Sequence, residues 1–293
     1  MKKERNSKLG YAKNGWLYKE KTAGYIFSAP FIFGFLFFVI VPVATSLYYA
    51  FCNYNILKPA RWVGLKNFID IFQDPTFYKA LGVTLKFAFI SVPLKLVFAL
   101  IVALILLKGT KLTPFYRAAY YLPSILGSSV AVAILWKRMF AVDGLVNKLL
   151  GIQFAWLGST TAALWVIILL AVWQFGSSML IFLSAMKQIP PELYEAARVD
   201  GAGGIYSFFR ITLPLLTPTI FFNLVMQLIN GFMVFAQGQI ITDGKPMNST
   251  LFYVLYMYQQ SFEYSKVGNG LDPARAGSAV HGPPVQDKKI LGL

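Results

Sequence analysis

Two groups of polar side chains, spaced as on a helix, interrupt otherwise apolar segments and could bind a polar solute. Asn223, Gln227 and Asn230 occupy positions i, i+4 and i+7 of one apolar segment, so they share one face of a helix. A similar group in another apolar segment consists of Trp173, Gln174, Ser177 and Ser178. These side chains could hydrogen-bond to and stack against a hydroxyl-rich solute. They could equally join neighbouring helices, at ~0.6 kcal/mol for each hydrogen bond. Both interpretations remain open here.

A polar segment between two apolar ones, residues 187–213, has the pattern of a helix-turn-helix. Pro190 and Pro191 predict a helix start, where a missing N–H group costs little. Gly201, followed by two more glycines, predicts the end of that helix in a left-handed turn. A second short helix then leads into Pro214. The first helix is acidic and carries small residues, so another protein could approach it closely and pair with its carboxylates. An ordinary amphipathic connector is the alternative.

The sequence has few of the residues that hydrolytic active sites and metal sites require. Cys52 is the only cysteine and His281 the only histidine, which excludes an intrachain disulfide and disfavours a zinc site or a Ser-His-Asp arrangement. A polytopic membrane enzyme remains the alternative from another class. It would need clustered carboxylates or histidines at a membrane face, whereas the acidic residues here are scattered. We therefore expect no catalytic residues and no bound cofactor or metal.

The composition is that of a membrane protein. Hydrophobic residues make up 57% of the chain and charged residues 13%, against about 25% charged residues in soluble domains. The net charge is +15, and seven Lys and Arg residues precede the first apolar segment. A basic stretch in that place is typical of a cytoplasmic juxtamembrane tail. The sequence has no basic patch interleaved with aromatic residues, which is the pattern that would indicate nucleic-acid binding. We therefore expect the chain to contact membrane lipid and not nucleic acid.

Five segments are long and apolar enough to cross a bilayer, which takes ~20 helical residues. We predict an all-α polytopic bundle whose spans are approximately 24–51, 80–107, 115–136, 162–186 and 214–238. The basic tail predicts a cytoplasmic N-terminus, and the segment 187–213 then also lies in the cytoplasm. Lys86 and Lys95 fall in the second span. Lys95 is the costlier to bury and should face the bundle interior or snorkel, with structural pairing favoured over substrate binding.

Specific motifs in this chain resemble a known family. The motifs are Glu195-Ala196-Ala197, Asp200-Gly201-Ala202, Phe208, Ile211, Leu213-Pro214 and Pro218, with further likeness in residues 62–68 and 117–123. Together they match the signature loop of bacterial binding-protein-dependent ABC importer permeases. The residues Ile189-Pro190 and Glu192-Leu193-Tyr194 resemble the carbohydrate branch of that family, similar to first permeases of the maltose and glycerol-phosphate type.

The resemblance implies a fold, partners and site residues. It implies a multi-pass permease of the bacterial inner membrane that works with a second homologous permease, separate ATPase subunits and an extracytoplasmic sugar-binding protein. The ATPase, rather than this chain, would use ATP, because the chain lacks a Gly-x-x-x-x-Gly-Lys-Ser/Thr loop. Residues implied in coupling to the ATPase are Glu195, Ala196, Ala197, Asp200, Gly201 and Ala202. Candidates for a sugar path are Trp173, Gln174, Ser177, Asn223, Gln227 and Asn230.

The resemblance also divides the chain. Residues 1–23 are expected to form the basic cytoplasmic tail, and 24–267 the importer transmembrane domain, with its core at about 78–267. Residues 268–293 do not resemble the family and have the composition of a disordered tail. A sixth span expected in the family is therefore missing from the pattern. A truncated, non-functional permease is a further alternative that this ending raises.

Overall fold

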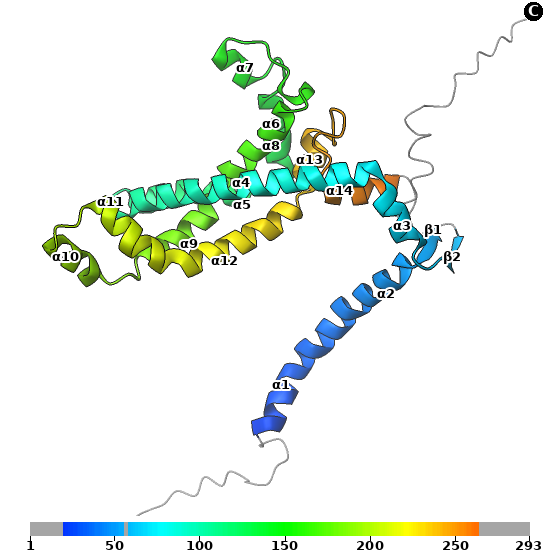
Figure 1. Ribbon diagram of the computed structural model, residues 1–293, viewed down its shortest axis with the longest axis horizontal. Helices are drawn as coiled ribbons and strands as arrows, with labels where there is room; N and C mark the ends of the chain where they lie inside the picture. Colours follow the sequence, from blue (N-terminus) through cyan, green and yellow to red (C-terminus); the bar gives the residue numbers. More distant parts are fainter. Residues whose placement is uncertain (1–19, 56–57, 264–293) are drawn as a thin grey trace, which may run out of the picture.

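The computed structural model describes residues 20–55 and 58–263 and confirms an all-α membrane protein (Figure 1). Residues 1–19 of the predicted basic tail (1–23) and the whole of the predicted atypical tail (268–293) lie outside the described residues. Three helices are long and apolar enough to cross a membrane, or up to five spans if each of two bent helix pairs counts as one. That upper number matches the five predicted spans.

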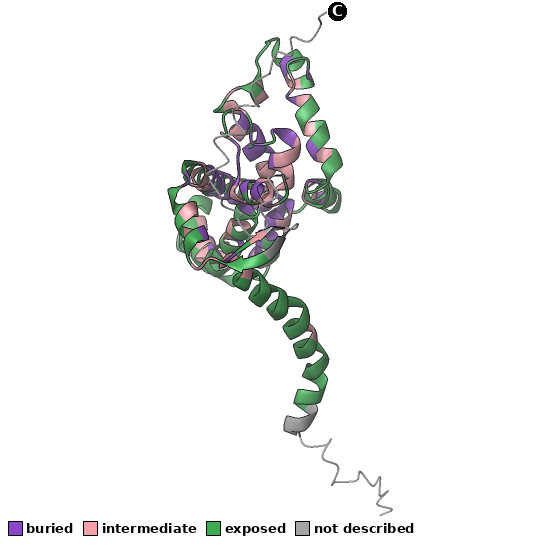
Figure 2. Cartoon of the chain, turned by 90° about the vertical axis from the view of Figure 1, so that its right-hand side faces the viewer, coloured by how far each residue is buried: buried purple, intermediate pink, exposed green. Residues whose placement is uncertain are grey.

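The first span stands apart from the remaining helices (Figure 1). It consists of α1 (Glu20–Phe35), the π-helical turn η2 (Leu36–Ile40) and α2 (Val41–Ala50). No side chain between Gly24 and Ala50 is buried, although this stretch is strongly apolar (Figure 2). Such a surface is stable only against lipid or another chain.

A short hairpin links the first span to the bundle. The strands β1 (Cys52–Asn55) and β2 (Lys58–Trp62) pair antiparallel, and α3 (Lys66–Gln73) follows them. Asn67 holds the junction, because its amide donates to the carbonyls of Ala50 at 2.8 Å and Cys52 at 3.0 Å. This hairpin is the one departure from an all-helical fold in the described ranges.

Helix α4 (Pro75–Leu107) is the axis of the bundle, with 33 residues and thus a length of about 50 Å. Asp74 caps its N-terminus by accepting a hydrogen bond from the backbone N–H of Thr76 at 2.8 Å. The helix packs against α8 (Ala162–Trp173), α9 (Gly176–Met186) and α12 (Leu213–Phe232). The alanines Ala80, Ala88, Ala99 and Ala103 are fully buried along it and permit close helix approach.

Two predicted spans are broken rather than straight. The third was predicted as one helix, but α5 (Thr113–Leu126) and α6 (Val130–Met139) meet at 97°. The break falls at Gly127-Ser128-Ser129, where Ser129 caps α6 by accepting from the N–H of Val132. Counting apolar residues alone overlooked this turn signal. The fourth span bends by 40° between α8 and α9.

The fifth span begins earlier and ends earlier than predicted. It runs continuously from Gly204 to Phe232 through α11 (Gly204–Ser207), the π-helical turn η4 (Phe208–Thr212) and α12. Three further elements then follow, α13 (Ala236–Ile241), α14 (Tyr253–Tyr258) and the π-helical turn η5 (Gln259–Glu263). The remaining short elements are α7 (Leu145–Leu150), η3 (Trp156–Gly158) and α10 (Pro191–Val199).

The buried apolar residues form two clusters along α4. One cluster packs around Phe87 of α4 and includes Ile167, Leu170, Phe252 and Tyr256. The other packs around residues 92–106 of α4 and contains parts of α9 and α12. The boundary between them falls close to the middle of α4, between Phe87 and Val92. A membrane-spanning core is thereby divided into two halves.

The start of α4 is tied to α14 by a buried hydrogen bond. The Tyr256 hydroxyl, on a side chain 1% exposed, donates to a carboxylate oxygen of Asp74. We expect Tyr256→Phe to lower the free energy of unfolding by about 1–3 kcal/mol, because Asp74 keeps its burial and loses a partner. The matched control is Tyr78→Phe, which removes an exposed hydrogen bond to the Phe72 carbonyl. Thermal unfolding in detergent measures both; equal shifts would contradict the assignment.

Candidate functional site

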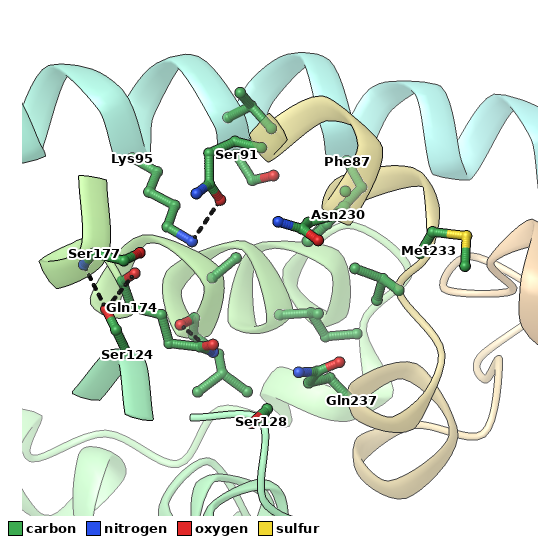
Figure 3. Close-up of a pocket in the computed structure, with 17 residues that line it drawn as sticks. Phe87, Ser91, Lys95, Ser124, Ser128, Gln174, Ser177, Asn230, Met233 and Gln237 are labelled. Atoms are coloured by element: carbon green, nitrogen blue, oxygen red, sulfur yellow. Dashed lines mark hydrogen bonds between the residues drawn. The ribbon is translucent and has the colours of Figure 1, made fainter. Parts of the chain in front are cut away.

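A polar cavity lies at the boundary between the two apolar clusters. Its volume is about 370 Å³, within the ~300–1,000 Å³ of small-molecule sites. Helices α4, α8, α9 and α12 and the turn after α5 all contribute to its wall (Figure 3). The polar residues that line it are Ser91, Lys95, Ser124, Ser128, Gln174, Ser177, Gln227, Asn230 and Gln237.

The break in the fourth span exposes backbone groups to this cavity, and one serine satisfies them. Ser124 of α5 donates to the carbonyl of Gln174 at 3.0 Å. The same hydroxyl accepts from the backbone N–H of Ser177, also at 3.0 Å. Gly176 permits the contact, since a Cβ there would lie 2.2 Å from the Tyr120 carbonyl oxygen. Non-helical backbone at membrane depth persists only where such partners or water are present.

A second polar connection joins α4, α9 and α12 across the cavity. The Lys95 ammonium donates to Gln227 Oε1 at 2.9 Å, and Gln227 Nε2 donates to the hydroxyl of Ser178 at 3.2 Å. Both functional ends of the Gln227 amide are therefore used. The prediction that Lys95 faces the bundle interior is confirmed.

The predicted path residues separate into two groups. One group lines the cavity: Gln174 at the end of α8, Ser177 in α9, and Gln227 and Asn230 in α12.

Two further candidates lie outside that wall. Trp173 packs on Trp136 of α6, with 5.7 Å between ring centroids. Asn223 is 1% exposed and donates to the Thr219 carbonyl of its own helix, one turn before Gln227. The cavity therefore borders only the part of this helix face that carries Gln227 and Asn230.

Several lining residues were missed because they belong to other segments. Ser124 directly follows Pro123, a pattern that could have indicated a break needing a hydroxyl partner. Ser91 and Lys95 are four residues apart on α4 and so share a face, which could have joined them to the polar stripe. Ser128 lies in a turn and Gln237 in a six-residue helix, and neither element is long enough to show a helical pattern of polar residues.

A second candidate site is the helix-turn-helix, which lies near the C-terminal end of α4 (Figure 1). Helix α10 begins directly after Pro190, as predicted. It ends in a Schellman turn: Gly201 has φ +76°, and the N–H groups of Gly201 and Ala202 donate to the carbonyls of Arg198 and Ala197 at 3.0 and 2.8 Å. Glu195, Ala196 and Asp200 are exposed on this unit.

The helix-turn-helix is fixed to the fifth span. The hydroxyls of Tyr194 and Thr212 are 2.8 Å apart and join α10 to the start of α12. Apolar side chains nevertheless point outward: Val199 is 88% exposed and Ile205 79%. A shallow apolar depression between the end of α4 and Phe208 lies beside them. The helix-turn-helix thus exposes acidic and apolar side chains while it is held by a membrane-spanning helix. Such a surface is typical of protein docking.

No group of three or more His, Cys, Asp or Glu side chains that could hold a metal ion occurs in the described part of the chain. The cavity wall there has amides, hydroxyls and one ammonium, which can bind a polar solute but offer no nucleophile paired with a base.

A bundle with a broken span, a polar cavity at mid-depth and an exposed helix-turn-helix defines a membrane transport subunit. Residues 85–277 match the model of the binding-protein-dependent transport system inner membrane components, and the chain belongs to this family. It is 49% identical over 258 residues to the probable ABC transporter permease protein YesP of Bacillus subtilis, covering 85% of this chain and 84% of that protein. It is 32% identical over 271 residues to the arabinooligosaccharides transport system permease protein AraP of the same organism, covering 88% and 85%.

Solved structures share the fold. A bacterial ABC transporter involved in the import of the acidic polysaccharide alginate matches with a TM-score of 0.74 at 24% identity, over 88% of this chain and 90% of that one. The same kind of transporter in complex with a pentasaccharide-bound periplasmic protein matches with a TM-score of 0.73 at 24% identity, over 85% and 86% of the two chains.

The Ser124 bridge makes a prediction about stability. Ser124→Ala leaves the Gln174 carbonyl and the Ser177 N–H without that partner, so we expect a loss of about 1–3 kcal/mol in the free energy of unfolding. Ser128→Ala is the matched control, because Ser128 lines the same cavity and is exposed; it should shift stability by less than ~0.5 kcal/mol. Thermal unfolding in lipid nanodiscs compares them, and a Ser128→Ala effect as large as that of Ser124→Ala would refute the bridge.

Proposed function

We propose that this chain is the membrane-spanning permease of an ATP-driven carbohydrate importer. It forms part of the sugar path and couples to a separate ATPase through the helix-turn-helix at residues 187–213. One observation carries the proposal. The continuous helix Gly204–Phe232 contributes to the wall of the polar cavity and is also joined to the exposed acidic helix α10. The hydroxyl and amide lining suits sugar hydroxyls, and the names of similar permeases include arabinooligosaccharides and lactose transport systems.

Three partners besides the sugar follow from this role. The unburied apolar surface of the first span supports assembly with a second permease, while leaving room for lipid contact. The exposed carboxylate of Glu195 and the small side chains of Ala196 and Ala197 suit a groove of an ATPase subunit. An extracytoplasmic binding protein would deliver the sugar, consistent with the family and with the complexed structural neighbour.

The docking role of α10 predicts loss of transport without loss of membrane insertion. Glu195→Lys reverses the charge offered to the ATPase. Gly201→Pro removes an N–H that closes the Schellman turn and is incompatible with φ +76°. We expect both variants to lose most sugar uptake and to copurify with at least about tenfold less ATPase, if the surface contributes ~1.4 kcal/mol or more.

Glu192→Lys is the matched control, since Glu192 is equally exposed on α10 one turn earlier and its charge changes in the same way. It should retain more ATPase than Glu195→Lys. Normal retention of the ATPase by Glu195→Lys and Gly201→Pro together would remove the basis for the docking role.

The orientation of the chain predicts which loops reach the outside of the cell. With the N-terminus in the cytoplasm, a cysteine placed at Ala202 should react with an impermeant thiol reagent only after permeabilisation. A cysteine at Leu149 in α7, which is 77% exposed and lies between the third and fourth spans, should react in intact cells. Native Cys52 is 0% exposed and adds little background. Labelling of the Ala202 position from outside would invert the topology.

A further inference from the structure

The polar cavity contains one charge that a neutral solute does not require. Among the described lining residues, Lys95 is the only charged one, and its side chain points into the cavity (Figure 3). The remaining polar partners in that lining are neutral amides and hydroxyls. The one ion pair within 4 Å in the described part of the chain joins Lys245 and Asp243, away from this site.

The hydrogen bond from Lys95 to Gln227 does not by itself account for a lysine. That bond joins α4 to α12, and a glutamine at the same position could donate a similar hydrogen bond without a charge. An ammonium in a membrane core carries a desolvation cost that an amide avoids. A lysine is favoured where the cavity takes in an anion, because the neutral partner Gln227 leaves other Nζ–H groups free to donate.

The break between α8 and α9 places two helix ends of opposite polarity beside the cavity. Helix α9, 11 residues long, begins at Gly176, and Ser177 in its first turn lines the cavity. The positive end of α9 is therefore offset by the negative end of α8, and Lys95 remains the one full charge in the described lining. The lining serines and amides can meanwhile bind hydroxyl groups.

We propose that the transported saccharide is acidic, and that Lys95 is the specificity-determining residue that binds its carboxylate. This inference rests on the proposed transport function and deepens it. A single ammonium balances one monoanionic carboxylate. A phosphate ester commonly recruits an arginine fork, several cations or free backbone N–H groups, and the described lining includes no arginine.

The test compares acidic and neutral ligands of the same shape on the assembled transporter in nanodiscs, without the binding protein. The probes are sugar trimers that each contain a single galacturonate, glucuronate or mannuronate residue, the neutral trimer made from each by reducing its carboxyl to a hydroxymethyl group, and a sugar phosphate. Affinities are measured by titration calorimetry. We expect at least one uronate trimer to bind more tightly than its reduced counterpart. Lys95→Gln should weaken that binding about 10- to 100-fold and change neutral binding less than about threefold.

Two variants keep the result interpretable. Lys95→Arg retains the charge and should retain the preference for the uronate. Lys86→Gln removes an exposed lysine of the same helix that lies outside this cavity, and should change neither affinity. Thermal unfolding checks that each variant is folded.

Each contrary outcome has a distinct meaning. Equal weakening of acidic and neutral trimers by Lys95→Gln would make Lys95 a structural link and overturn the inference. Preference of the unmodified complex for neutral trimers, or for the sugar phosphate, would also overturn it while leaving a carbohydrate permease intact. Failure of every saccharide to bind, and to be taken up when the binding protein is restored, would instead count against the proposed function.

Discussion

Backbone groups freed inside a membrane must find partners, and the break between α8 and α9 places this demand at the centre of the molecule. Ser124 meets it with one hydroxyl that both donates and accepts across the break. Helices α5 and α6 meet at 97°, and Gly127 at their junction packs closely on Gln174, since a Cβ there would lie 2.3 Å from that side chain. The cavity, its polar wall and the division of the apolar core into two clusters follow from this local arrangement.

The two clusters give the cavity its position. Phe87 and its neighbours close it on one side, and the packing around Leu96 and Phe182 closes it on the other. Helix α4 contributes to both apolar clusters, and this packing fixes the positions of Ser91 and Lys95 along the helix axis. A binding site built on packed helices is more rigid than one built on loops, which suits selection between solutes that differ by one functional group.

Much of this arrangement could be predicted from the sequence, and the exceptions have physical reasons. Apolar length located the spans, and the two prolines and Gly201 located α10 and its turn, because those residues act through their own backbone. Helical periodicity identified the stripe of Gln227 and Asn230. It could not show where the cavity stops, so it did not reveal that Asn223 and Trp173 lie outside the lining. Lys95 was located in the interior, but its unbalanced charge became visible only when its neighbours from other helices were known.

The two candidate sites are parts of one mechanical unit. The hydroxyls of Tyr194 and Thr212 fix α10 to a helix that continues without interruption to Phe232. Gln227 on that helix lies about 22 Å from Thr212 at 1.5 Å per residue, and it holds Lys95 through its amide oxygen. If an ATPase docks on α10 as proposed, a displacement of α10 would be passed to the helix that carries Gln227. The hydrogen bond to Lys95 is short and directional, so such a movement would also change the surroundings of the ammonium that we propose as the partner of an anion.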